Sequence, residues 1–161
     1  VGSEMCIRDS LDGYSIELVT GGPGMTDETQ FLNVRNVVAH GVDVVDTADF
    51  ARLVNKQASD FLDRYFTTAE LVTADEGGDR TERLASRFAV KEAVLKALGT
   101  GWGDGIAFTD VEVVSQRSGA PTVVLHRRLV KIASERGIAH WLVSASHTSS
   151  IAIASVIALT A

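Results

Sequence analysis

Residues 87–101 read RFAVKEAVLKALGTG, a run of good helix formers that ends in glycine. The run predicts the second half of a long helix over 81–98, with Gly99 as its C-cap. At about 100° per residue, Glu92 and Lys96 share one face of this helix. The simplest interpretation of the two is an ordinary ion pair, which stabilises a helix by about 0.3–0.5 kcal/mol.

The predicted helix has no broad polar face. Arg87 and Lys91 form a second charged pair about 140° around the axis from Glu92 and Lys96. Apolar side chains fill most of the surface between the two pairs. At least one pair is therefore expected to lie against protein instead of water. The alanines beside Glu92 and Lys96 would let another backbone or a ligand approach closely.

Upstream, the β-branched run that ends in GVDVVD at 41–46 predicts a buried strand. Asp43 lies inside this run, although aspartate is disfavoured in strands. A buried carboxylate needs an ion pair, hydrogen bonds or a metal. An aspartate that caps a nearby loop is the simpler alternative, and the residue alone does not exclude it.

The remaining patterns predict short elements around the long helix. Thr47 is a candidate cap for a helix, and Thr67 with Glu70 forms a capping-box pattern. The element order β-α-α-β-β-α-β-β indicates an α+β domain with an antiparallel β-sheet packed on the long helix. The later elements are expected at 108–114, 122–125, 129–136, 142–146 and 151–158.

Composition limits the functions to consider. The net charge of −6 disfavours general nucleic-acid binding but leaves room for a phosphate-bearing small molecule. The single cysteine, Cys6, cannot form an intrachain disulfide, and no signal peptide is recognisable. Polar residues interrupt 141–161, so two strands are expected there and no membrane span. We expect a soluble, cytoplasmic protein.

The N-terminal residues differ from the rest of the chain. Residues 1–30 have no core pattern and contain the breaker cluster Gly21-Gly22-Pro23-Gly24. We interpret them as a disordered tail or a non-native extension, and 31–161 as the folded domain. Met25 would be a sensible natural start, and residues 1–24 are expected to be dispensable for stability and activity.

Two further features carry little weight alone. The segment GTGWGDG at 99–105 follows a helix, whereas a phosphate-cradling loop precedes one, so we interpret it as a helix stop and connector. His147 is expected in a turn, where histidine is usually solvated. His40 and His126 have no metal-ligand spacing with it.

Seven segments nevertheless occur in a telling order: GVDVVD at 41–46, FT at 66–67 with Glu70, RFAVKEAVLKA at 87–97, GTG at 99–101, FTDVEV at 108–113, GAP at 119–121 and VSASHT at 143–148. This ordered set, spread over about 38–159, resembles the holo-acyl-carrier-protein synthase family. That family is the small trimeric class of 4′-phosphopantetheinyl transferases. The resemblance implies transfer of phosphopantetheine from coenzyme A to a serine of apo-acyl carrier protein.

The resemblance also implies roles for the conspicuous charged residues. Asp43 and Glu92 match the family's Mg²⁺ ligands, and magnesium prefers such oxygen donors. Lys96 matches the lysine that contacts the coenzyme A phosphates and offsets charge on the departing 3′,5′-ADP. Glu92 and Lys96 are thus the expected catalytic residues. The base for the serine proton stays open between Glu92 and a water on the metal.

Other positions match the coenzyme A site. His147 and Thr148 correspond to residues that a neighbouring subunit of a homotrimer supplies, and Arg87 is a weaker candidate for the nucleotide phosphates. Asp49 departs from the family, which usually has a basic residue there to meet the acidic carrier. Arg52 and Lys56 on the same predicted helix are possible substitutes. Asp46 stands where the family more often has Glu.

Two alternatives to this enzyme remain on the sequence alone. One is a catalytically silent trimeric domain of the same fold that binds a carrier protein. The other is a magnesium-dependent enzyme acting on another coenzyme A or nucleotide substrate. Retention of Asp43, Glu92, Lys96 and His147 argues against the silent domain, because a structural relic need not keep all four.

Overall fold

A ten-residue strand, β1 (Val37–Asp46), comes first in the part of the chain that the computed structural model describes. That part comprises residues 36–76, 78–103 and 105–161, with the backbone alone for 56–60. The elements after β1 are α1 (Thr47–Tyr65), α2 (Thr68–Asp75), α3 (Arg80–Ala97), η2 (Phe108–Asp110), β2 (Val111–Ser115), β3 (Pro121–Leu125), α4 (Arg128–Glu135), β4 (His140–His147) and β5 (Ile151–Leu159). The predicted tail over 1–30 and the start of the predicted domain at 31 lie outside the described residues.

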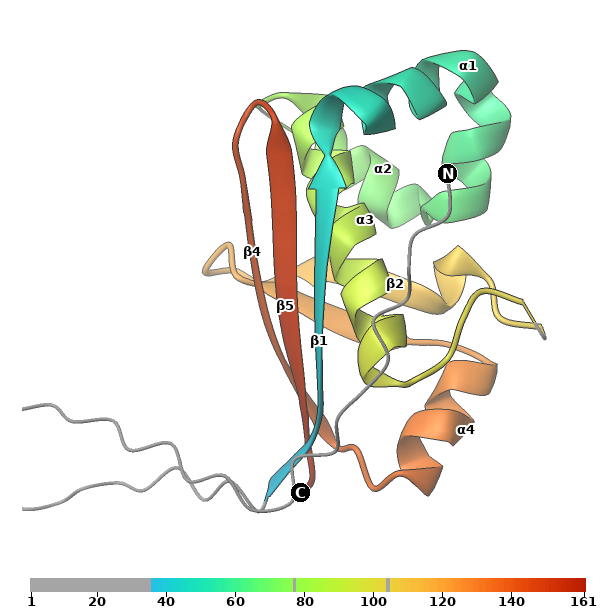
Figure 1. The fold of residues 1–161 in the computed structure, drawn as a ribbon, viewed down its shortest axis with the longest axis vertical. Coiled ribbons are helices and arrows are strands. Elements are labelled where there is room, and N and C mark those ends of the chain that lie inside the picture. The colour runs from blue at the N-terminus through green and yellow to red at the C-terminus, as the bar shows by residue number, and fades with distance from the viewer. Residues whose placement is uncertain (1–35, 77, 104) are drawn as a thin grey trace, which may run out of the picture. The chain divides into compact units, whose positions relative to one another are not determined.

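The strands are antiparallel, as expected for this α+β chain, but they form two sheets instead of one. β5 lies between β1 and β4, and β2 pairs with β3 in a separate hairpin (Figure 1). Gly119, at φ +85°, lies in the turn of that hairpin. α1 and α2 lie at the end of the larger sheet where β1 ends, and α4 lies at the opposite end (Figure 1).

Strand alternation gives the larger sheet two different faces. Asp43 pairs with Ala154, and Val44 pairs with Ile153. Ala154 is buried in one core cluster with α3, whereas Val44 and Ile153 are exposed. Because paired residues point to the same side, Asp43 lies on the α3 side of the sheet and Val44 lies on the exposed side.

β1 comes very close to α3 at Gly41. A Cβ atom at position 41 would overlap the Ala93 carbonyl oxygen and lie 2.9 Å from the Ala97 amide nitrogen. Glycine is therefore required here by close backbone approach. The small side chains of the helix allow this approach, as the alanine pattern predicted.

The predicted helix ends are mostly confirmed. Thr67 and Glu70 form the expected capping box at the start of α2, with hydrogen bonds of 2.8 and 3.3 Å. Gly99, at φ +56°, follows the end of α3. The prediction of Thr47 as a cap is wrong, because Asp46 accepts the Asp49 amide at 2.9 Å and Thr47 is the first helical residue.

The sequence predicts that residues 108–110 begin a strand, but they form the short 3₁₀ helix η2. The Asp110 side chain accepts the Ala107 amide at 3.0 Å and so closes this turn. The strand starts only at Val111. Local capping by Asp110 thus overrides the β-propensity of the segment.

A buried lysine fixes η2 and β2 to α3. The Lys91 ammonium donates to Glu70 at 2.8 Å and to the carbonyl oxygens of Phe108 and Val111 at 3.0 and 2.5 Å. The side chains of both Lys91 and Glu70 are 0% exposed. Arg87, the other member of Lys91's predicted pair on the helix, is also buried, which confirms the expectation that at least one charged pair of the helix lies against protein. None of the helices in the described residues is long and apolar enough to cross a membrane.

Candidate active site

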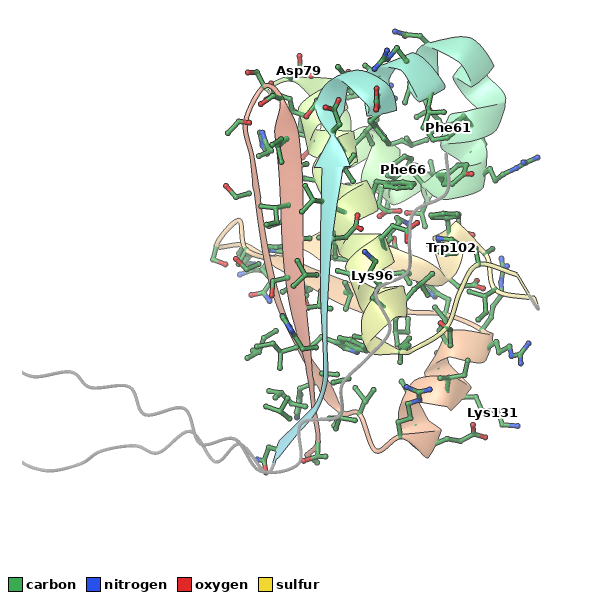
Figure 2. All side chains as sticks on the ribbon, in the orientation of Figure 1. Phe61, Phe66, Asp79, Lys96, Trp102 and Lys131 are labelled. Atoms are coloured by element: carbon green, nitrogen blue, oxygen red, sulfur yellow. The ribbon has the colours of Figure 1, made fainter. Side chains whose placement is uncertain are left out.

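Asp43 and Lys96 meet between β1 and α3. The Lys96 Nζ lies 2.8 Å from Asp43 Oδ1, and the Asp43 side chain is only 13% exposed (Figure 2 labels Lys96 on α3). Burial raises the pKa of Asp43, although its bond to Lys96 acts in the opposite direction. The aspartate inside the strand therefore has a charged partner on α3, which the loop-capping alternative does not provide.

Glu92 lies one helical turn before Lys96 and is held differently. Its Oε1 accepts the indole N–H of Trp102 at 2.6 Å. Burial raises the pKa of Glu92, and the neighbouring Asp43 charge raises it further, while Trp102 and Lys96 oppose this. The simple Glu92–Lys96 ion pair is thus replaced by bonds from each residue to a different partner.

The arrangement leaves two carboxylates against one ammonium. Asp43 lies close enough to Glu92 that its charge raises the pKa of the Glu92 carboxyl group. Among the described residues there is no group of three or more His, Cys, Asp or Glu that could hold a metal. Two carboxylates suit Mg²⁺, which keeps waters and takes phosphate oxygens as its other ligands. The donor set of Asp43 and Glu92 therefore fits this ion.

Arg87 and His147 meet in a second place. Both line a cavity of about 200 Å³, together with Arg83 and Ser86. Arg87 Nη1 donates to the Arg83 carbonyl oxygen at 3.3 Å. Arg87 Nε and Ser86 Oγ are buried and have no hydrogen-bond partner among the residues that the structure describes. Such donors in a cavity suit an anionic ligand.

Glu82 orients the histidine of this cavity. His147 Nδ1 lies 3.2 Å from Glu82 Oε2, at the first turn of α3. This contact leaves Nε2 of His147 for another partner. Thr148 does not line the cavity. Its hydroxyl accepts the amides of Ser150 and Ile151 at 3.3 and 3.2 Å and closes the β4–β5 turn.

The predicted site residues therefore form two groups. Asp43, Glu92 and Lys96 meet on one side of α3. Arg87 precedes Glu92 by five residues, which places it about 140° around the helix axis. Arg87 and His147 are consequently on a different side of α3 within one chain.

Sequence reasoning missed the partners that surround these residues. Trp102 lies in the segment that the sequence predicts as a connector, although its indole donates to Glu92. Ser86 and Glu82 lie on the same helix as the predicted residues, but no spacing rule singled them out. An aromatic residue inside a glycine-rich segment was the one available signal for Trp102.

The family model described as the 4′-phosphopantetheinyl transferase superfamily matches residues 39–154. The chain belongs to this superfamily. The match includes both groups of site residues, Asp43 with Glu92 and Lys96, and Arg87 with His147. The resemblance inferred from seven ordered segments is therefore confirmed.

Individual members of the superfamily align over nearly their whole length. The holo-[acyl-carrier-protein] synthase of Solibacter usitatus is 35% identical over 121 residues, which cover 75% of this chain and 97% of that protein. The crystal structure of the Neisseria meningitidis holo-[acyl-carrier-protein] synthase aligns with a TM-score of 0.69 and 31% identity, over 76% of this chain and 98% of that one. The Helicobacter pylori synthase in complex with coenzyme A aligns with a TM-score of 0.65 and 28% identity, over 74% and 98%.

Proposed function

We propose that this chain is a holo-acyl-carrier-protein synthase. It transfers the 4′-phosphopantetheine group of coenzyme A to a serine hydroxyl of an apo-acyl carrier protein and releases 3′,5′-ADP. The observation that carries this proposal is the cluster of Asp43, Glu92 and Lys96, two partly buried carboxylates beside one ammonium, in a chain of this superfamily. The attacking serine belongs to the carrier, so the chain needs no nucleophile of its own.

Asp43 and Glu92 would hold Mg²⁺ beside the pyrophosphate of coenzyme A. When bound, the ion supplies positive charge that polarises and orients the phosphoryl group. Lys96 supplies the other positive charge. Its side chain is 42% exposed and can turn from Asp43 toward an incoming phosphate. There it would stabilise the charge on the departing 3′,5′-ADP.

Glu92 is also one of two candidates for the base that accepts the serine proton. Its raised pKa brings the carboxylate nearer to the range in which a general base works at neutral pH. A water in the site is the other candidate. Asp43 is held by Lys96 and is the less available acceptor.

The nucleotide end of coenzyme A is assigned to the cavity of Arg87 and His147. The buried Arg87 guanidinium suits a phosphate group, and so does the Ser86 hydroxyl, which has no hydrogen-bond partner in the described part of the chain. Thr148, in the adjoining β4–β5 turn and outside the cavity, would contact coenzyme A from there. Because this cavity and the Asp43 cluster lie on different sides of α3, one coenzyme A would use the cluster of one subunit and the cavity of its neighbour.

The exposed face of the larger sheet supports an assembly of subunits. Five large apolar side chains on this face are each at least 40% exposed: Val42, Val44, Leu142, Ile151 and Ile153. Contiguous apolar surface of this kind marks interaction sites. We assign the face to a homotrimer, with the sites between subunits. Light scattering that gave an active monomer would contradict this assignment.

The transfer itself is tested by incubating the chain with coenzyme A, Mg²⁺ and an apo-acyl carrier protein. Mass spectrometry should detect the mass of one phosphopantetheine added to the carrier. The matched control is a carrier whose acceptor serine is replaced by alanine, which should gain nothing. No added mass on the intact carrier would overturn the proposed function.

A further inference from the structure

Trp102 makes a bond that the proposed reaction has not used. Three residues after Gly99, its indole N–H turns back to Oε1 of Glu92, at 2.6 Å (Figure 2 labels Trp102). Glu92 is the one residue placed both in the metal site and among the candidate bases. A partner that fixes its carboxylate therefore acts directly on the reacting centre.

The indole is itself held in place by an aromatic stack. Trp102 stacks on Phe108 with ring centroids 3.2 Å apart and an interplanar angle of 19°. Phe108 stacks in turn on Phe88 of α3, at 5.4 Å and 20°. The carbonyl oxygen of Phe108 accepts the buried Lys91 ammonium. The ring that bonds to Glu92 is therefore supported from the same helix that carries Glu92.

The backbone of the segment allows this return. Gly103 and Gly105 adopt φ values of +124° and +81°, which residues other than glycine rarely adopt. Gly103 and Ile106 form an isolated antiparallel bridge. Glycine conformations directly after Trp102 thus accompany the return of its indole to Glu92.

We propose that Trp102 is a positioning residue for Glu92. Its N–H donates to Oε1 of Glu92, so that Oε2 of Glu92 would remain available to a magnesium ion that Asp43 also binds. Ligands of a metal are commonly oriented by such outer partners, whose loss costs about 10–100-fold in metal affinity or activity. The inference rests on the proposed role of Glu92 as a magnesium ligand. The competing interpretation is that Trp102 only covers the core.

Phenylalanine separates these two interpretations, because it keeps a stacking ring and removes the N–H. Metal affinity is measured directly, by calorimetry with Mg²⁺ and by electron paramagnetic resonance with Mn²⁺, in the presence of coenzyme A. Trp102→Phe should weaken affinity about tenfold. Trp141→Phe is the matched control, because Trp141 lies in β4 and is the only other tryptophan of the chain. It should bind the metal like the unchanged protein.

A second measurement covers the case in which Trp102→Phe does not fold. The indole N–H resonances of Trp102 and Trp141 are compared by ¹⁵N NMR in the unchanged protein and in Glu92→Gln. The resonance of Trp102 should shift and that of Trp141 should not. Identical spectra, or unchanged metal affinity in a folded Trp102→Phe, would overturn the positioning role alone. Absence of metal binding by the unchanged protein would overturn the proposed metal site as well.

Discussion

Lys96 Nζ lies 2.8 Å from Asp43 Oδ1 and so joins α3 to the middle of β1 across the candidate site. The pair is unequal, because the aspartate side chain is 13% exposed and the lysine side chain is 42% exposed. The carboxylate is therefore fixed by the fold, whereas the ammonium is free to change partner. This asymmetry gives the two residues separable roles.

Replacement of each partner should have a different effect. Asp43→Asn should weaken Mg²⁺ binding, because one of two ligand oxygens loses its charge. Lys96→Met should lower kcat by about 10²-fold, since it removes charge stabilisation in the transition state. It should leave metal affinity unchanged or tighter, because a competing cation is gone. Calorimetry and the rate of carrier modification measure the two effects.

Asp43→Asn should therefore change mainly the affinity for Mg²⁺, and Lys96→Met should change mainly the rate of carrier modification. If Lys96→Met weakened metal binding as much as Asp43→Asn did, the lysine would be a structural support of the metal site. If Asp43→Asn kept full metal affinity, Asp43 would not be a ligand.

The pH dependence of activity follows from the raised pKa of two carboxyl groups. Burial raises the pKa of both Asp43 and Glu92. Metal binding requires their ionised forms, so activity should fall on acidification at a higher pH than ordinary carboxylates would give. Because Glu92→Gln and Asp43→Asn are themselves expected to lose activity, the metal-binding constant of the unchanged protein is measured against pH. An acid limit at the position of ordinary carboxylates would contradict the prediction.

The raised pKa values of Asp43 and Glu92 should also make the stability of the metal-free protein depend on pH. A carboxyl group whose pKa is higher in the folded protein contributes stability below its unfolded pKa, and this contribution is lost as pH rises through the folded value. The metal-free protein should therefore lose stability on going from acid toward neutral pH through these two groups. Glu92→Gln should make Tm depend less on pH in that window, with Tm at neutral pH equal to or above that of the unchanged protein.

The sequence was informative wherever one local pattern dominated. The capping box of Thr67 and Glu70 and the glycine after α3 depend on neighbouring residues only. The partner of Asp43 could not be predicted from spacing, because Lys96 is 53 residues away and is brought there by packing of β1 on α3. The same limit applies to Glu92 and Lys96, because their four-residue spacing favours an ion pair between them, whereas Lys96 pairs with Asp43 and Glu92 accepts the Trp102 indole. Trp102 was missed because glycines around it indicated only a turn.

Gly41→Ala should destabilise the fold strongly. The added methyl group would overlap the Ala93 carbonyl oxygen, so β1 and α3 would have to separate. Overpacking of this kind typically costs about 1–3 kcal/mol in unfolding free energy, and backbone contact places it at the upper end. Gly101→Ala is the matched control, because nothing lies within 4 Å of its added Cβ. Equal unfolding free energies for the two variants, measured by urea denaturation, would contradict the close approach.

Carrier recognition is expected to depend on Asp49. Asp49 forms an ion pair with Arg52 on the exposed side of α1. Asp49 thus pairs with the Arg52 guanidinium, which could otherwise contact an acidic carrier. Asp49→Asn should therefore lower KM for the carrier several-fold at low salt, with KM for coenzyme A unchanged.

Asp75→Asn controls for the loss of one negative charge, because Asp75 is also exposed and is paired with Arg80 at the end of α2. The same decrease of KM in both variants would indicate a general effect of net charge. No decrease in Asp49→Asn would place the carrier elsewhere than on α1.

The buried ion pair of Lys91 and Glu70 should make a large contribution to stability. Lys91→Met leaves the Glu70 carboxylate buried without its cation, and loss of one partner of a buried pair costs about 3–5 kcal/mol. Glu70 still accepts the amides of Thr67 and Val113, at 2.8 and 3.0 Å. Glu70→Gln can keep part of these bonds and removes the charge. The double variant should therefore lose much less stability than the sum of the two single variants.

A thermodynamic cycle from urea unfolding measures this coupling. Additive losses would mean that the two charges do not stabilise each other, and that the backbone bonds alone hold η2 and β2 on α3.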